Sequence, residues 1–172
     1  MFAALVAAWV LGLDQLTKAW VRESIRLYEA RPVWEGFFQV TYVKNTGAAW
    51  GMFSGRNWAL VALAAAMLAA LAAFRRKLFP RGPLGGLTMG LLSGGIAGNL
   101  LDRLRMGFVT DYLDFHVGGW HWPAFNVADS AIFMGVCCYV ACAWIEERRE
   151  KKASAAHAAA GSAAGDESGS AG

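Results

Sequence analysis

Carboxylates at the borders of apolar stretches are the residues of this sequence best suited to chemistry. Asp129, in "PAFNVADSAIFMG", begins a segment that runs apolar to Ile145, and Asp111 and Asp114 precede it in "VTDYLDFHVGG". Water hydrates such a charge cheaply and lipid does not, so a carboxylate at this border either ends a helix or serves a reaction. Of two close carboxyl groups, one stays ionised while the other keeps its proton, and together they can supply a general base and a general acid.

A structural role also accounts for Asp129. The residues Asn126-x-x-Asp129 have the form of a capping box, in which two side chains satisfy N–H groups at the start of a helix. Capping and catalysis are compatible, because a helix N-terminus would hold Asp129 ionised, as a general base requires. In an extended "VTDYLDF", Asp111 and Asp114 face opposite sides, so that only one of them can meet Asp129.

Two further groups of polar residues interrupt apolar runs. Asp14 and Lys18, in "DQLTK", are four residues apart and share a helical face, where an interfacial ion pair explains them without any further function. Asn99 and Arg103, in "GGIAGNLLDRL", have the same spacing. Two interpretations of this segment stay open. It is either a small-residue packing face capped by polar residues, or a hydrogen-bonding group that binds a polar backbone or a phosphate.

Other reaction chemistries find less support. Asp114, His116 and His121 form only a loose possible metal set, and the sequence contains no H-E-x-x-H motif of a zinc peptidase. Ser93 precedes two glycines, but residues 84–101 and 127–145 contain no histidine, so a serine protease built there would lack its base. We therefore expect no metal and no cofactor.

The composition indicates that membrane-spanning helices position these residues. Hydrophobic residues make up 56% of the 172 positions and charged residues only 17%. A bilayer core about 30 Å thick needs about 20 apolar residues of helix, with a lower limit near 17. Four runs meet this condition, at residues 1–20, 58–74, 84–101 and 127–145. The first is expected to be a retained helix and not a signal peptide, since Asp14 and Lys18 interrupt it and no cleavage site follows.

Basic residues beside these runs predict the orientation. They follow the second and fourth runs, two crossings apart, and they are Arg75, Arg76, Lys77, Arg81, Arg148, Arg149, Lys151 and Lys152. Cytoplasmic loops are enriched in Lys and Arg, so both clusters and both termini are expected in the cytoplasm, with residues 21–57 and 102–126 outside. The net charge of +3 then reflects topology, and no nucleic-acid partner is expected.

The remaining segments complete the predicted fold. Residues 37–45 alternate with a period of two and are rich in aromatic and β-branched side chains, so residues 37–51 are expected to form a small β element on the outer membrane face. Residues 19–30 either continue the first helix or lie in the interface. Residues 153–172 are mainly Ala, Gly and Ser without an apolar period, and we expect a disordered tail there, after a membrane domain of residues 1–152.

Five motifs together resemble the bacterial lipoprotein signal peptidases, also called signal peptidase II. They are "DQLTK" at 14–18, "VKNTGAAWG" at 43–51, "GGIAGNLLDR" at 94–103, "VTDYL" at 109–113 and "FNVADSAI" at 125–132, in the order of that family. Each motif alone is weak, whereas the combination is specific. The resemblance covers residues 5–145. The family's usual basic leader does not precede the first helix, so the natural start is expected upstream.

The resemblance implies an α-helical membrane aspartic protease with four transmembrane helices and a small extracytoplasmic β-cradle. Such a protease removes signal peptides from prolipoproteins and cuts before a cysteine that carries a diacylglyceryl group. It works in the bacterial cytoplasmic (inner) membrane, in contact with the membrane lipids. The resemblance further implies that Asp111 and Asp129 are catalytic. The residues that it implies for substrate binding or support of the site are Asp14, Lys18, Asn45, Gly47, Asn99, Arg103 and Asn126.

The main alternative is a small ion- or proton-coupled membrane transporter, whose membrane acids would form a relay. Two features speak against it, because the acids gather near one membrane face and no inverted repeat is evident. A non-catalytic scaffold would explain the glycines but not two acids that flank a loop.

Overall fold

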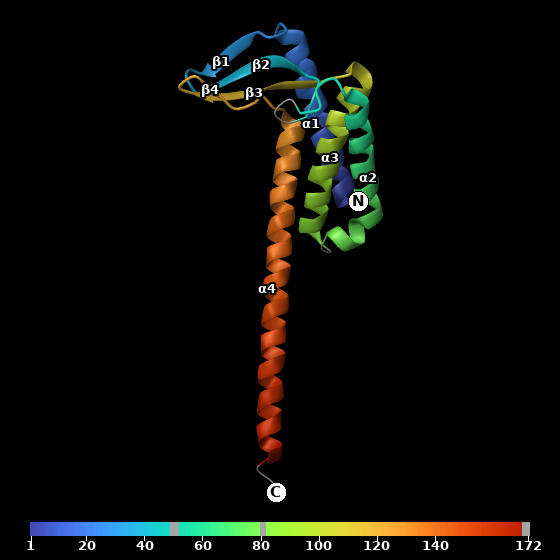
Figure 1. Ribbon diagram of the computed structural model, residues 1–172, viewed down its shortest axis with the longest axis vertical. Helices are drawn as coiled ribbons and strands as arrows, with labels where there is room; N and C mark the ends of the chain where they lie inside the picture. Colours follow the sequence, from blue (N-terminus) through green and yellow to red (C-terminus); the bar gives the residue numbers. More distant parts are fainter. Residues whose placement is uncertain (49–51, 80–81, 170–172) are drawn as a thin grey trace.

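The computed structural model describes residues 1–48, 52–79 and 82–169. Four long helices stand side by side, and a small antiparallel sheet lies across one end of them (Figure 1). The helices are α1 (Phe2–Ser24), α2 (Asn57–Leu78), α3 (Pro83–Met106) and α4 (Val127–Gly169). The strands are β1 (Ala30–Trp34), β2 (Phe38–Asn45), β3 (Val109–Val117) and β4 (Trp120–His121).

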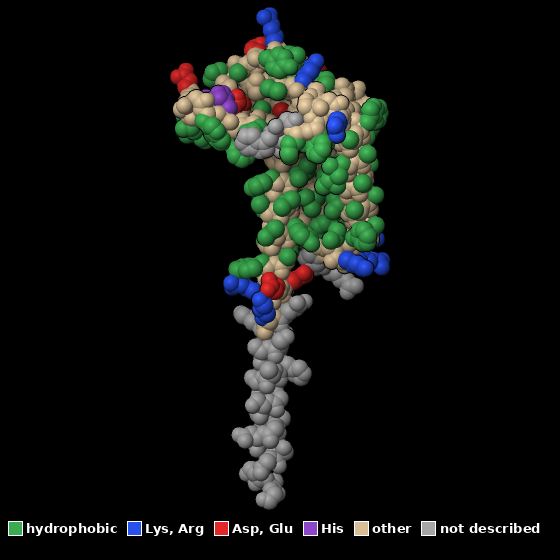
Figure 2. Space-filling model, in the orientation of Figure 1, with side chains coloured by type: hydrophobic (Ala, Val, Ile, Leu, Met, Phe, Trp, Pro, Cys, Tyr) green, Lys and Arg blue, Asp and Glu red, His purple; other side chains and the backbone are tan. Residues whose placement is uncertain are grey.

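The exposed surface of the helices is apolar. Each helix contains a stretch long and apolar enough to cross a membrane, which confirms the predicted fold class; the stretch in α4 ends at Arg148. Large side chains such as Trp9 and Leu16 are exposed, whereas Lys18 and Asp102 are buried. Figure 2 shows hydrophobic side chains covering the helices, with Lys and Arg gathered toward the two ends. This distribution suits a protein surrounded by lipid, which solvates apolar side chains and not charges.

Helix α3 is the central helix and packs against the other three. Its glycines allow this, because a Cβ atom at Gly94 would lie 2.8 Å from the carbonyl oxygen of Ala7 in α1. A Cβ atom at Gly95 would lie 2.5 Å from the carbonyl oxygen of Ala128 in α4. Only a residue without a side chain permits such contacts. The close contact that the glycines favour is therefore present, and it brings the polar residues of α1, α3 and α4 within reach of one another.

The sheet is larger than the β element predicted at residues 37–51. Its strands are ordered β1-β2-β3-β4, and neighbouring strands are antiparallel. Only β2 lies in the predicted segment, of which residues 49–51 are outside the described residues. Strand β3 comes from the connection between α3 and α4, and its pairing sets Asn45 beside Val109 and Val43 beside Asp111. Residues from two distant connections therefore meet in one sheet.

Two helix boundaries bear on the predictions. Helix α1 continues to Ser24 and the chain is extended at Ile25, so residues 19–30 continue the helix only in part. Helix α4 extends to Gly169 through the Ala-rich residues, and alanine has the highest helix propensity. The division into a membrane domain of residues 1–152 and a disordered tail stays a prediction.

Candidate active site

Strand β3 and the first turn of α4 bring two carboxylates to one place. Asp111 lies in β3, and Asp129 is in the first turn of α4. The chain before α4 pairs with β3: the backbone N–H of Leu113 donates to the carbonyl oxygen of Phe125 at 2.8 Å, and the N–H of Phe125 donates back at 3.1 Å. This pairing sets Asn126, the next residue, beside both carboxylates.

Asn126 contacts Asp111 and Asp129 at the same time. Its Nδ2 donates to Oδ1 of Asp111 at 2.7 Å. Its Oδ1 accepts the backbone N–H of Asp129 at 3.0 Å, and its own backbone N–H donates to Oδ2 of Asp129 at 3.3 Å. The last two bonds form the reciprocal capping box that the sequence indicates. Asp129 is therefore a helix cap, and through Asn126 it is also linked to a second carboxylate.

Two further asparagines donate to the carboxylates. Nδ2 of Asn45, at the end of β2, donates to Oδ2 of Asp111 at 2.8 Å. Nδ2 of Asn99, in α3, donates to Oδ1 of Asp129 at 2.7 Å. Side-chain amides are neutral donors, so they orient a carboxylate without placing a positive charge against it. This arrangement suits a pair in which one carboxyl group keeps a proton.

Burial sets the protonation of Asp111, which is only 2% exposed. Burial raises the pKa of this carboxyl group from its usual 3.8 to about 7, and the nearby charge of Asp129 also raises it. The hydrogen bonds from Asn45 and Asn126 lower the pKa, but by less. A carboxyl group that titrates near neutral pH can exchange a proton during a reaction.

A buried ionic cluster lies behind Asn99. Nζ of Lys18 is 2.9 Å from Oδ2 of Asp14 and 3.1 Å from Oδ2 of Asp102, and it donates to Oδ1 of Asn99 at 3.0 Å. The three charged side chains are at most 1% exposed. The predicted ion pair between Asp14 and Lys18 is therefore present, and α3 and α4 cover it. Its place at the membrane interface stays a prediction. Lys18 directs the amide of Asn99 so that its Nδ2 faces Asp129.

Asp102 and Gln15 also belong to this cluster, although no site role was predicted for either residue. Asp102 accepts Nε2 of Gln15 at 3.0 Å and the backbone N–H of Thr110 at 3.1 Å. Nε2 of Gln15 also lies 3.1 Å from Oδ2 of Asp14. Sequence spacing could have indicated the role of Asp102, because it lies three residues after Asn99. Residues three apart in a helix are neighbours on one face.

Arg103 connects α3 to the chain after β2. Its guanidinium donates to the carbonyl oxygen of Gly47 at 2.9 Å and to that of Asn99 at 3.3 Å. The backbone N–H of Gly47 in turn donates to Oδ1 of Asn45 at 2.9 Å. The packing interpretation of the "GGIAGNLLDRL" segment is confirmed, since its glycines pack against neighbouring helices. Binding of a further polar backbone or a phosphate by Asn99 and Arg103 stays a prediction. The polar backbone that Arg103 binds in this structure is that of the chain itself.

The residues named from the resemblance form one connected set of contacts. It runs from Asp14 to Lys18, Asn99, Asp129, Asn126, Asp111, Asn45, Gly47 and Arg103 in turn. Asp114 contacts Gln39 and His121 instead, as the alternation along β3 predicts. The set lies at the junction of the helices and the sheet.

Comparison with known proteins finds relatives over most of the chain. The sequence model of the family described as Signal peptidase (SPase) II matches residues 6–145. The lipoprotein signal peptidase of Syntrophotalea carbinolica is 41% identical over 143 residues, which are 81% of this chain and 89% of the relative. The lipoprotein signal peptidase of Geobacter metallireducens is 40% identical over 152 residues, 87% of this chain and 94% of the relative.

Solved structures share the fold. A bacterial membrane enzyme determined by the in meso method at 2.3 Å resolution has a TM-score of 0.79 and 30% identity, and the match covers 87% of this chain and 90% of that one. A second bacterial membrane enzyme, at 1.9 Å resolution, has a TM-score of 0.72 and 31% identity, with 80% and 89% covered. The similarity thus holds in both sequence and fold.

Proposed function

The chain belongs to the signal peptidase II family, and on this premise we propose that Asp111 and Asp129 are its two catalytic residues. It is a membrane protease that removes signal peptides from prolipoproteins. The transporter alternative finds no support among its relatives. The observation that carries the proposal is that both carboxylate residues bind Asn126. Its side-chain Nδ2 donates to Asp111, and its Oδ1 accepts the backbone N–H of Asp129.

The proposed reaction uses one ionised and one protonated carboxyl group. The ionised group takes a proton from water as the water oxygen attacks the carbonyl carbon of the scissile peptide bond. The protonated group gives its proton to the carbonyl oxygen, and a tetrahedral intermediate forms. When the intermediate collapses, the C–N bond breaks and the leaving nitrogen takes the proton that the first carboxylate removed from water. A hydroxyl group of the intermediate returns its proton to the second carboxylate, so the dyad is restored. Because the two groups titrate as a pair, neither is assigned as the acid or the base.

The surrounding residues hold this pair in place. The side chains of Asn45, Asn99 and Asn126 donate to three of the four carboxylate oxygens, and the backbone N–H of Asn126 donates to the fourth, so each oxygen has a hydrogen-bond donor. Lys18 holds Asn99 from behind and is itself neutralised by Asp14. We assign these residues to orientation of the dyad, since a misplacement of about 1 Å is enough to slow a reaction about 100-fold.

The position of the dyad supports a substrate that is partly lipid. The carboxylates lie where the apolar helices meet the sheet, so acyl chains could lie along the helices while a peptide lies at the sheet (Figure 1). The scissile bond then precedes a cysteine that carries a diacylglyceryl group, and membrane lipids surround the enzyme. Basic residues end α2 on the side away from the sheet, which supports a cytoplasmic location of that side. Both termini would lie in the cytoplasm of a bacterium and the dyad at the outer face of its inner membrane.

Mass spectrometry of a prolipoprotein substrate tests this function. Purified protein in detergent is mixed with a prolipoprotein whose cysteine carries the diacylglyceryl group, and the product is expected to lose the mass of the signal peptide. The same prolipoprotein without the lipid is the matched control and should be cleaved at least tenfold more slowly. No mass loss from the diacylated substrate would contradict the protease function. Equal rates for the two substrates would contradict only the requirement for the lipid.

A further inference from the structure

A second group of titratable side chains lies in the β3–β4 hairpin, away from the dyad. Asp114 and His116 are two residues apart in β3 and therefore point to the same face of the strand. His121, in β4, is the direct cross-strand partner of His116. The two strands are joined by Gly118 and Gly119, whose φ angles of +57° and +84° allow a tight two-residue turn. The backbone alone thus puts the three side chains on one face.

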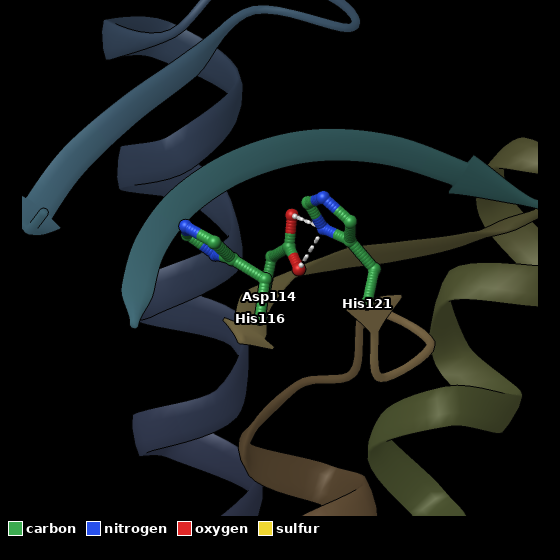
Figure 3. Close-up of side chains that lie close together, drawn as sticks. All are labelled: Asp114, His116 and His121. Atoms are coloured by element: carbon green, nitrogen blue, oxygen red, sulfur yellow. Dashed lines mark hydrogen bonds and ion pairs between the residues drawn. The ribbon is translucent and has the colours of Figure 1, made fainter. Parts of the chain in front are cut away.

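The three side chains are close enough to share a ligand. Nδ1 of His121 lies 3.0 and 3.2 Å from the two carboxylate oxygens of Asp114, as the dashed lines in Figure 3 mark. The rings of His116 and His121 stack with centroids 4.9 Å apart. One potential ligand atom from each of Asp114, His116 and His121 lies within 4.8 Å of the other two.

Two further observations point to a bound cation. Nδ1 of His116 is buried and has no hydrogen-bond partner among the described residues, so its lone pair or its proton is unsatisfied. Nε2 of Gln39, on β2, donates to Oδ2 of Asp114 at 2.6 Å. Hydrogen bonds of this kind orient the carboxylates that bind metals.

We propose that Asp114, His116 and His121 form a Zn²⁺ site with a fourth position open to water. Imidazole nitrogens and carboxylate oxygens are ligands that zinc accepts, and zinc has no geometric preference from its d electrons. At ordinary zinc–ligand distances the ligand atoms of a tetrahedral site are about 3.3 Å apart, so rotation of the imidazole rings must close the longest separation. The His121 side chain is 51% exposed, which leaves an entry path.

Zinc in this site clamps β3 to β4 close to the candidate active site. Asp114 follows Asp111 by three residues on the same strand. None of the three ligands has a contact with the dyad among those found in the described residues, and the proposal is independent of the assignment of the catalytic residues. The metal therefore holds the hairpin and takes no part in the cleavage chemistry.

Zinc titration of the untagged, full-length protein in detergent tests the site. After removal of bound metal, competition with a fluorescent zinc chelator should give one equivalent of Zn²⁺ per chain. His116→Ala and His121→Ala should each weaken binding at least tenfold, and Gln39→Ala should weaken it about 10- to 100-fold. His157→Ala is the matched control, because the sequence has three histidines and this one lies outside the hairpin.

A measurement on the wild-type protein keeps the test independent of the folding of the variants. Diethyl pyrocarbonate modifies accessible histidines, and peptide mass spectrometry reports each position separately. Saturating Zn²⁺ should slow modification of His116 and His121 at least tenfold and leave His157 unchanged. The proposal would be overturned if the protein bound no zinc, or if binding were lost only in His157→Ala. Equal modification of His116 and His121 with and without zinc would also overturn it.

Discussion

Replacement of Asp111 by asparagine is expected to abolish cleavage while it stabilises the folded protein above neutral pH. An asparagine side chain has the shape of a protonated aspartate and keeps one acceptor oxygen, but its NH2 group only donates and it cannot exchange a proton. Loss of a general acid or base slows a reaction by about 100- to 10,000-fold, and a carboxyl dyad has no second pair to replace it. Cleavage by Asp111→Asn should therefore fall at least about 100-fold.

The gain in stability follows from the burial of this carboxyl group. Burial raises the pKa of Asp111 from 3.8 to about 7 in the folded protein. A carboxyl group with a raised folded-state pKa contributes stability that is fully present below the unfolded pKa and is lost as pH rises through the folded pKa. The window of loss is thus from about pH 4 to about pH 7. At about 1.36 kcal/mol per pKa unit, the wild type loses roughly 2.7 kcal/mol between pH 5 and pH 8, and the variant does not.

Thermal unfolding followed by tryptophan fluorescence at pH 5 and pH 8 measures this difference, and a gel-shift assay measures cleavage. Glu147→Gln is the matched control, because Glu147 is an exposed carboxylate of α4 that pairs only with Lys151 among the contacts of the described residues. Glu147→Gln should change neither the stability difference between pH 5 and pH 8 nor the cleavage activity. An Asp111→Asn protein with more than a tenth of the wild-type activity would refute the catalytic role. An equal stability difference at both pH values would refute the argument from burial.

Three further predictions concern the surroundings of Asp111. Asp129→Asn keeps an oxygen that can accept the N–H of Asn126, so the variant should fold and insert but lose cleavage at least about 100-fold; near-normal turnover would leave Asp129 as a helix cap only. Gly98→Ala should destabilise the protein by about 1–3 kcal/mol and so lower the melting temperature, because its Cβ would lie 2.6 Å from Oδ2 of Asp14. Gly12→Ala, with no atom within 4 Å of its Cβ, is the control and should have no such effect. Chelation of metal should leave cleavage within twofold of normal, since the two carboxyl groups supply both acid and base. Activity that chelation removes and zinc restores, with an unchanged melting temperature, would contradict the aspartyl mechanism; a loss of activity together with a lower melting temperature would reflect only the proposed zinc site in the hairpin.

The membrane helices could be predicted from sequence because lipid imposes a simple length and composition on each of them. Residues 58–74 and 84–101 fall inside α2 and α3 for this reason. The capping box of Asn126 and Asp129 could also be predicted, since its members are three residues apart and depend only on local geometry. Predictions of this kind need no knowledge of how the helices pack.

The full extent of the sheet could not be predicted in the same way. Strand β1 contains Pro32 and all its residues are exposed, so it has no alternation of apolar and polar side chains to detect. Strand β3 is recognisable as extended, but its pairing with β2 joins residues separated by two helices. Such a pairing depends on where α1, α3 and α4 end in space, which local patterns do not contain.

The chemistry of the dyad depends on how charge is distributed among helices, and this too is visible only in three dimensions. Lys18 pairs with both Asp14 and Asp102, so these two carboxylates, and not the dyad, compensate its positive charge. The side-chain donors found at Asp111 and Asp129 in the described part of the chain are amides of asparagine, which are neutral. A lysine or arginine in direct contact would favour ionisation of both carboxyl groups and remove the proton that the reaction needs. The buried ionic cluster therefore supports the site by orienting Asn99, which lies between the charged amine of Lys18 and the carboxylate of Asp129.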